Sequence, residues 1–210
     1  MNIASHGLHG LYALTDSGLT AGRPLSDAVA AAIRGGTRLV QYRDKSADHA
    51  RRTREAQVLL AVCREYEVPF IVNDDVALAG EIGADGVHLG REDAALEEAR
   101  VQLGPRALIG VSCYASLERA IAAEHAGADY VAFGSFFASP SKPQAVHAPQ
   151  SLLTEARQRL NVPICAIGGI TPANGAELLT AGADMLAVIS GLFAQTDIEA
   201  AARCYARLFQ

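Results

Sequence analysis

Eight short apolar runs, separated by longer amphipathic segments, constrain the fold of this chain more than any other feature. Each run is nearly continuous in apolar residues, which is typical of parallel strands covered on both faces. The predicted strands are Leu11–Leu14, Leu39–Tyr42, Phe70–Val72, Gly86–Leu89, Leu108–Val111, Tyr130–Phe133, Ile164–Ile167 and Leu186–Ile189. Helical segments fill the gaps, most clearly Leu25–Arg34, Ala47–Tyr66, Ser116–His125, Ser151–Leu160 and Ile198–Phe209. Eight strand-then-helix units without a linker predict one α/β domain over residues 1–210, a (β/α)8 TIM barrel.

A short glycine-containing phrase recurs before four of the predicted strands. It reads Gly35-Gly36-Thr37, Gly83-Ala84-Asp85, Gly127-Ala128-Asp129 and Gly182-Ala183-Asp184. Glycine can adopt the left-handed conformation that ends a helix, so we interpret these phrases as structural. The alternative fold is an open doubly wound sheet, but that fold needs no eighth strand. The apolar run around Ala187 therefore favours the barrel.

Composition and charge exclude several classes of protein. The formal net charge of −5 makes the surface as a whole repel nucleic acid and acidic membranes. No apolar stretch reaches the roughly 20 residues of a membrane span, and residues 1–10 lack the pattern of a signal peptide. Four scattered cysteines without a CxxC pair indicate reduced thiols. We therefore expect a cytoplasmic protein that binds neither nucleic acid nor membrane, with a homo-oligomer left open.

Polar residues follow the second predicted strand, in the segment Gln41-Tyr42-Arg43-Asp44-Lys45. Alternate side chains of a strand share a face, so Gln41, Arg43 and Lys45 are expected to point toward the barrel mouth. An arginine fork and a lysine charge suit a diphosphate, and the amide suits a heterocycle. A solvated charged loop is the alternative interpretation of this segment.

Carboxylates follow the third and fourth predicted strands, in Asn73-Asp74-Asp75 and Glu92-Asp93. Mg²⁺ typically takes one or two carboxylates together with substrate phosphate, and neighbouring strand ends could supply them. Asp75 and Asp93 also each precede a helix and suit an N-cap. We predict a cap at Asp75, whereas for Asp74 and Asp93 a metal role is favoured over capping only together with the other motifs of the chain.

The remaining strand ends carry hydroxyls and glycines. Ser112 ends the fifth strand, and the long connection of residues 135–149 contains Ser139-Pro140-Ser141-Lys142. A connection of that length in a compact barrel is usually functional. Gly168-Gly169 follows the seventh strand and Ile189-Ser190-Gly191 ends the eighth. Loops at these two places form the usual phosphate site of a TIM barrel.

Taken together, these motifs resemble the thiamine-phosphate synthase family. They are QYRDK, NDD, GVHLGREDA, VSCYA, SPSKP, AIGGI and VISG, and the resemblance extends from Tyr12 to Gly191. It implies an Mg²⁺-dependent transferase that acts on two small molecules. One is 4-amino-2-methyl-5-(hydroxymethyl)pyrimidine diphosphate, and the other is a thiazole phosphate or its carboxylated form. The products would be thiamine phosphate and diphosphate.

The resemblance also implies roles for individual residues. Asp74 and Asp93 would bind Mg²⁺, and the diphosphate would be neutralised by Arg43, Lys45 and Lys142. The pyrimidine diphosphate would be held by Gln41, Tyr42, Arg43, Asp44, Lys45, Asn73, Ser112 and Lys142. The thiazole phosphate would be held by Ser139, Pro140, Ser141, Gly169, Ile189 and Ser190. The family's lid more often reads F-P-T-x-T-K, whereas Phe137 here precedes Ala138-Ser139-Pro140-Ser141-Lys142, with serine retaining the hydroxyls.

Three alternatives share this fold or its ligands. A thiazole tautomerase needs no diphosphate site, so the Gln41–Lys45 segment argues against it. Another sugar- or heterocycle-phosphate enzyme would share the phosphate loops but not that segment. A non-catalytic thiamine-phosphate-binding regulator would be revealed by a single turnover without release. The synthase mechanism that the resemblance implies needs no histidine base, so we expect His88 to be an inward hydrogen-bonded side chain and His147 a solvated loop residue.

Overall fold

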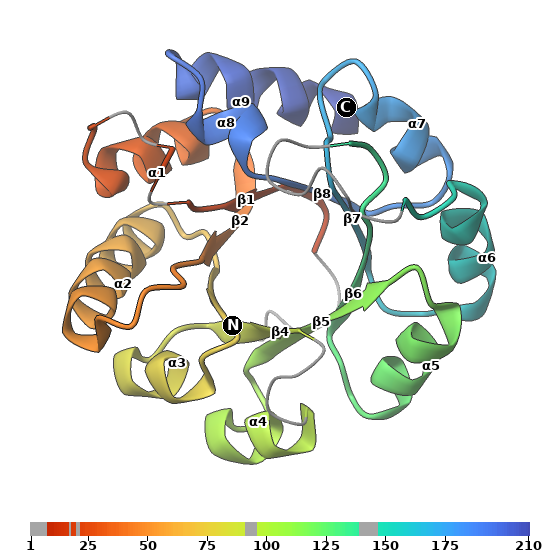
Figure 1. Ribbon diagram of the computed structural model, residues 1–210, viewed down its shortest axis with the longest axis horizontal. Helices are drawn as coiled ribbons and strands as arrows, with labels where there is room; N and C mark the ends of the chain where they lie inside the picture. The colour runs from red at the N-terminus through yellow and green to blue at the C-terminus, as the bar shows by residue number, and fades with distance from the viewer. Residues whose placement is uncertain (1–7, 17, 20–21, 91–95, 139–146) are drawn as a thin grey trace.

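In the computed structural model, eight parallel strands close into a barrel in sequence order, with β1 pairing with both β2 and β8 (Figure 1). The structure describes residues 8–16, 18–19, 22–90, 96–138 and 147–210. The strands are β1 Gly10–Leu14, β2 Thr37–Tyr42, β3 Phe70–Asn73, β4 Gly86–Leu89, β5 Leu108–Tyr114, β6 Tyr130–Phe133, β7 Ile164–Ile167 and β8 Met185–Val188. The predicted TIM barrel is confirmed.

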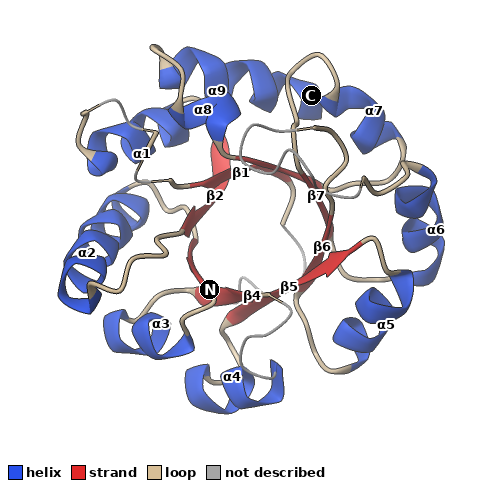
Figure 2. Ribbon diagram, in the orientation of Figure 1, coloured by secondary structure: helices blue, strands red, loops and turns tan. Residues whose placement is uncertain are grey.

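Helices surround the barrel in the order expected of strand-then-helix units (Figure 2). They are α1 Leu25–Arg34, α2 His49–Glu65, α3 Val76–Ile82, α4 Leu96–Leu103, α5 Leu117–His125, α6 Ser151–Arg159, α7 Gly175–Thr180, α8 Ser190–Phe193, α9 Ile198–Ala206 and the 3-10 turn η1 Arg207–Phe209. No helix in the described part of the chain is long and apolar enough to cross a membrane.

The predicted elements differ from the observed ones mainly at the end of the barrel. β8 ends at Val188 rather than Ile189, because Ile189 turns the chain (φ −111°, ψ −89°) directly into the four-residue α8. Sequence patterning did not reveal α8, since one turn of helix carries no periodicity. β5 extends to Tyr114, beyond the predicted Val111.

Strand side chains alternate between two apolar layers. Outward residues such as Leu11 and Ala13 pack beneath the helices in the larger layer. Inward residues such as Tyr12, Leu39 and Met185 fill the barrel. The short alternating period therefore decides which residues of each strand can reach the barrel interior.

The recurring Gly-Ala-Asp phrase ties strands together in pairs. The Oδ2 atoms of Asp85, Asp129 and Asp184 accept backbone N–H bonds, each at 2.8 Å, from Phe70 of β3, Ile109 of β5 and Ile164 of β7. Each aspartate thus directly precedes an even-numbered strand. Its carboxylate accepts a hydrogen bond from the first or second residue of the odd-numbered strand before it. We refer to these three contacts as the aspartate clamps.

The glycines of these phrases behave as predicted. Gly36, Gly83, Gly127 and Gly182 all have positive φ angles. Gly83 is the clearest case: it caps α3 with φ 67° and ψ 44°, a left-handed conformation that side chains with a Cβ rarely adopt.

Candidate active site

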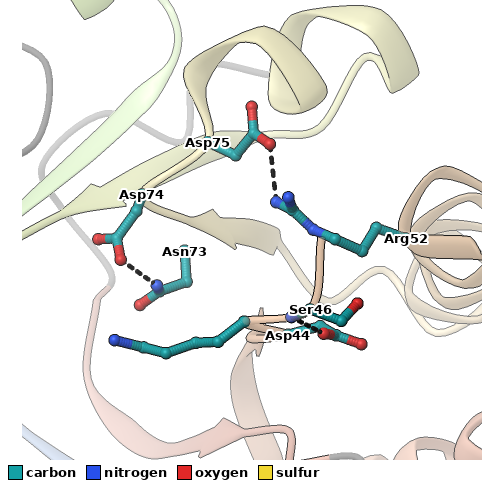
Figure 3. Close-up of a pocket in the computed structure, with 7 residues that line it drawn as sticks. Asp44, Ser46, Arg52, Asn73, Asp74 and Asp75 are labelled. Carbon is teal, nitrogen blue, oxygen red and sulfur yellow. Dashed lines mark hydrogen bonds and ion pairs between the residues drawn. The ribbon is translucent and has the colours of Figure 1, made fainter. Parts of the chain in front are cut away.

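A cavity of about 330 Å³ opens where β2 and β3 end. It is lined by Asp44, Lys45, Ser46, Arg52, Asn73, Asp74 and Asp75. Figure 3 shows the labelled polar groups facing one another across this space. The cavity lies at the carboxyl ends of the strands, where TIM-barrel enzymes place their active sites.

Gln41, near the end of β2, lies inside the barrel and is 1% exposed. Its Nε2 donates a 2.5 Å hydrogen bond to the hydroxyl of Tyr12. Its Oε1 is buried and has no hydrogen-bond partner among the described residues. A buried amide oxygen without a partner costs about 1–3 kcal/mol, so a ligand donor at this position would be strongly favoured.

The two cations of the segment lie beside the mouth. The backbone N–H of Arg43 donates to Thr15 Oγ1 at 3.0 Å, which anchors β2 to the end of β1. The guanidinium of Arg43 lies 4.0 Å from the Asp16 carboxylate. Lys45 lines the cavity, and its ammonium has no ion-pair partner among the described carboxylates. Lys45 is therefore available to an anionic ligand.

Tyr42 points away from the mouth. Its hydroxyl donates to Glu55 Oε2 of α2 at 2.9 Å, and its ring packs in the outer layer. Burial raises the pKa of Tyr42, and the hydrogen bond to Glu55 raises it further. Any contact between Tyr42 and substrate would have to come from its main chain, which limits the role expected from sequence.

The Asp44 carboxylate is held within the loop after β2. It accepts a 2.6 Å hydrogen bond from the Ser46 N–H and pairs with Arg51. Burial by itself raises the pKa of Asp44, but the hydrogen bonds from Ser46 and the charges of Arg51 and Arg52 outweigh it, and the net shift is downward. The ionised carboxylate thereby fixes the loop that carries Lys45.

The end of β3 is conformationally unusual. Asp74 adopts φ 63°, a left-handed value that is uncommon for a residue with a side chain. Its backbone N–H donates to His88 O at 2.8 Å, and its Oδ2 accepts from Asn73 Nδ2 at 2.6 Å. Such strain is concentrated at functional sites, and here it turns the carboxylate into the cavity (Figure 3).

Asp75 is the N-cap of α3, as predicted. Its Oδ1 accepts from the Leu78 N–H at 2.9 Å. Its Oδ2 accepts from Arg52 Nη2 at 2.7 Å, which links α3 to α2. Both carboxylate oxygens are thus engaged within the protein.

Ser112 lies near the end of β5. Its Oγ is 2.9 Å from His88 Nε2. The guanidinium of Arg119 donates to Ser112 O at 2.8 Å and to Gly90 O at 3.1 Å, which joins the ends of β4 and β5. His88 is 8% exposed and inward-facing, as expected from its place in the strand.

Glycines allow close approach after β7. A Cβ on Gly168 would lie 2.0 Å from Ser135 Oγ, and one on Gly169 would lie 2.4 Å from Ala138 O. The β7 loop therefore packs directly against the chain that follows β6. Gly169 has no Cβ, which makes room for Phe137 and Ala138 beside its backbone.

After β8 the chain enters α8 at once. The first backbone bonds into this turn come from the N–H groups of Leu192 and Phe193 to Ile189 O. The N–H groups of Ser190 and Gly191 precede these bonds, and the first N–H groups of a helix have no acceptor within the helix. Gly191 itself makes room for Tyr205, whose hydroxyl would lie 2.3 Å from a Cβ there.

A model of the family described as thiamine monophosphate synthase matches residues 11–192. The chain belongs to the thiamine monophosphate synthase family. It is 53% identical over 205 residues to the thiamine-phosphate synthase of Nitrosococcus oceani, covering 98% of this chain and 94% of that protein. It is 54% identical over 203 residues to that of Thioalkalivibrio sulfidiphilus, covering 97% and 96%.

A solved structure of the same kind agrees with the fold. Thiamine phosphate pyrophosphorylase from Pyrococcus furiosus superposes with a TM-score of 0.87 at 34% identity, covering 96% of both chains. The predicted resemblance is thereby confirmed. The chain is a transferase of thiamine biosynthesis that forms thiamine phosphate from a pyrimidine and a thiazole moiety.

Part of the predicted synthase site lies outside the described residues, namely Asp93, Ser139, Pro140, Ser141 and Lys142. Within the described ranges, no three His, Cys, Asp or Glu side chains form a metal cluster. Sequence reasoning also missed Thr15, Arg119 and Tyr12, which hydrogen-bond to the predicted site residues Arg43, Ser112 and Gln41. Thr15 and Tyr12 are polar residues at or inside β1, and that position could have indicated them, whereas Arg119 lies in α5 and carries no such signal.

Proposed function

We propose that this synthase works by a dissociative substitution at the pyrimidine methylene carbon. The bond from that carbon to the diphosphate oxygen breaks first, and its electron pair leaves with the diphosphate. The thiazole nitrogen then donates its lone pair to form the new carbon–nitrogen bond. The aminopyrimidine ring donates electrons to the carbocation between the two steps, so no side-chain nucleophile or strong base is required.

One observation carries this proposal: positive, amide and carboxylate groups converge on one cavity at the ends of β2 and β3. Arg43 and Lys45, together with Lys142, would neutralise the departing diphosphate. Asn73 would hold the pyrimidine diphosphate, and Gln41 and Ser112 would orient the ring. Catalysis is then positioning and charge neutralisation.

The same cavity fits Mg²⁺. Asp74 is held there in a strained conformation, beside the amide of Asn73, and hard oxygen donors are the ligands this ion prefers. We assign Asp74 and Asp93 as its protein ligands. When bound, the ion would add positive charge against the diphosphate.

The phosphate of the thiazole would lie on the other side of the mouth. We assign it to the backbone around Gly169, Ile189 and Ser190, where N–H groups precede the first bonds of α8. The 139–141 segment would complete this site. We place the reaction in the cytoplasm, where the buried thiols of this chain would stay reduced.

The decisive experiment measures thiamine phosphate formed from both substrates with Mg²⁺, for the wild type and Lys142→Ala. An interaction that strengthens as the bond breaks lowers the barrier, so kcat should fall by about 10²-fold. Lys142→Arg should recover only part of the rate, because a planar fork replaces a point charge. A rise in KM alone would show that Lys142 only binds substrate.

A second measurement tests the carbocation. A pyrimidine carrying an electron-withdrawing group in place of its methyl should react more slowly, since the ring then stabilises the cation less. An unchanged rate in single-turnover experiments would contradict the dissociative order of steps.

A further inference from the structure

A chain of hydrogen bonds crosses the inside of the barrel from Gln41 to Ser112. Gln41 Nε2 donates to Tyr12 OH at 2.5 Å, and Tyr12 OH lies 2.9 Å from Tyr130 OH. Tyr130 OH lies 2.9 Å from His88 Nδ1, and His88 Nε2 lies 2.9 Å from Ser112 Oγ. We call these five side chains, from β2, β1, β6, β4 and β5, the barrel relay.

The interior members of the relay are sealed from water. Tyr12 is 1% exposed and Tyr130 is fully buried. Burial raises the pKa of both phenols, so each keeps one proton to donate. A buried hydroxyl proton without an acceptor carries a penalty of about 1–3 kcal/mol, so each link must have a definite direction.

The orientation of Gln41 decides those directions. Because Gln41 Nε2 donates to Tyr12, the Tyr12 proton must go to Tyr130, its other partner among the described residues. Tyr130 then donates to His88 Nδ1, which must be unprotonated. His88 is therefore neutral with its proton on Nε2, and it donates to Ser112 Oγ.

The two ends of the relay offer a ligand opposite hydrogen-bonding groups, an acceptor at Gln41 and a donor at Ser112. Gln41 Oε1 is a buried acceptor with no partner among the described residues. Ser112 accepts from His88, so its own proton is left to donate outward. Reversing the direction of one hydrogen bond in the relay would leave a buried proton or lone pair without a partner, at a cost in free energy. Only reversing every hydrogen bond of the relay, including a flip of the Gln41 amide, avoids that cost.

We propose that the barrel relay sets the donor–acceptor order that selects a 4-aminopyrimidine over its 4-oxo counterpart. The exocyclic amine donates to Gln41 Oε1, and a ring nitrogen accepts from the Ser112 hydroxyl. A 4-oxopyrimidine presents a carbonyl and a ring N–H instead, which matches neither end. Tyr12, Tyr130 and His88 are positioning residues for this choice, which rests on the proposed binding of pyrimidine by Gln41 and Ser112.

The packing around Tyr130 shows that its hydroxyl is specifically accommodated. A Cβ on Gly110 would lie 2.0 Å from Tyr130 Cζ and 2.4 Å from its hydroxyl oxygen. Glycine on β5 therefore makes space for the phenol in the centre of the barrel. The relay depends on this space, because the phenol bridges β1 to β4 through the barrel centre.

The first test compares kcat/KM for the aminopyrimidine diphosphate and its 4-oxo analogue in wild type, Tyr130→Phe and Tyr12→Phe. Each variant removes one hydroxyl of the relay, so the direction of the hydrogen bonds at Gln41 no longer fixes the direction at Ser112. The ratio of kcat/KM for the amino substrate to kcat/KM for the 4-oxo analogue should therefore fall at least about tenfold. Tyr205→Phe is the matched control, because it removes a buried phenol hydroxyl that bonds Ile170 O outside the relay. Its preference should equal that of the wild type.

The second test reads the His88 tautomer directly by ¹⁵N NMR of wild-type protein, with the resonance assigned by its loss in His88→Asn. We expect a protonated Nε2 and a bare Nδ1 in the ligand-free enzyme, with a mixture of tautomers in Tyr130→Phe. The tautomer of the wild-type protein can be read even if a tyrosine variant fails to fold.

The outcomes separate the relay from the proposed function. An Nδ1-protonated His88, or a preference unchanged in both tyrosine variants, overturns the relay. If no thiamine phosphate forms with the amino substrate, the proposed function fails, while the tautomer result still decides whether the relay is polarised.

Discussion

Asp75 uses its two carboxylate oxygens for two structural contacts, and substitutions can separate them. Asp75→Asn keeps an oxygen that can cap the Leu78 N–H but removes the charge that faces Arg52. Asp75→Ala removes both contacts. Loss of an N-cap costs about 1 kcal/mol, and a partly exposed ion pair contributes up to about 1 kcal/mol.

From these contacts, Asp75→Ala should lower the free energy of unfolding by about 2 kcal/mol and Asp75→Asn by less than about 1 kcal/mol. Urea unfolding measures both changes. Because both oxygens already have protein partners, the Mg²⁺ concentration for half-maximal activity should stay the same in Asp75→Asn. By contrast, Asp74→Asn should raise it severalfold. A raised Mg²⁺ requirement in Asp75→Asn would refute our division of the two neighbouring carboxylates into cap and ligand.

Three further predictions follow from individual contacts. Gly169→Ala should raise KM for the thiazole phosphate more than KM for the pyrimidine, because its Cβ would lie 2.4 Å from Ala138 O and its φ of +62° disfavours a side chain. An equal rise in both KM values would contradict this. In the native protein, a thiol reagent at pH 8 should label Cys204 alone, since Cys204 is exposed while burial raises the pKa of Cys63 and Cys113 to about 12; labelling of two or more thiols would contradict it. Asp44 has a lowered pKa, so its contribution to stability is full above the unfolded-state pKa near ~3.9 and is lost as the pH falls through the folded-state value. Asp44→Asn should therefore show a shallower loss of stability on acidification, and an unchanged slope would argue against this role.

Local chemistry explains why much of the fold could be predicted. Apolar runs predicted the strands because both faces of a barrel strand are covered, and the cap at Asp75 follows from a short carboxylate before a helix. Alternation also predicts that Gln41 faces inward and Tyr42 outward. The family resemblance assigned both residues to substrate binding. Neighbouring residues of one motif on a strand nevertheless point to opposite faces.

The barrel relay could not be predicted in this way. Tyr12 and Tyr130 lie 118 residues apart in the sequence, and neither was predicted to be a site residue. Their hydroxyls meet only because two strands on different sides of the barrel direct long phenols to its centre. Such a network depends on distances between strands, which no local pattern carries.

The aspartate clamps show that the barrel repeats in units of two strands. They join β3 to β4, β5 to β6 and β7 to β8, so the same device recurs at every second strand interface. At the corresponding place stands Thr37, the first residue of β2, whose buried hydroxyl has no partner among the described residues. The repeating element of these contacts is therefore two strands and two helices rather than one of each.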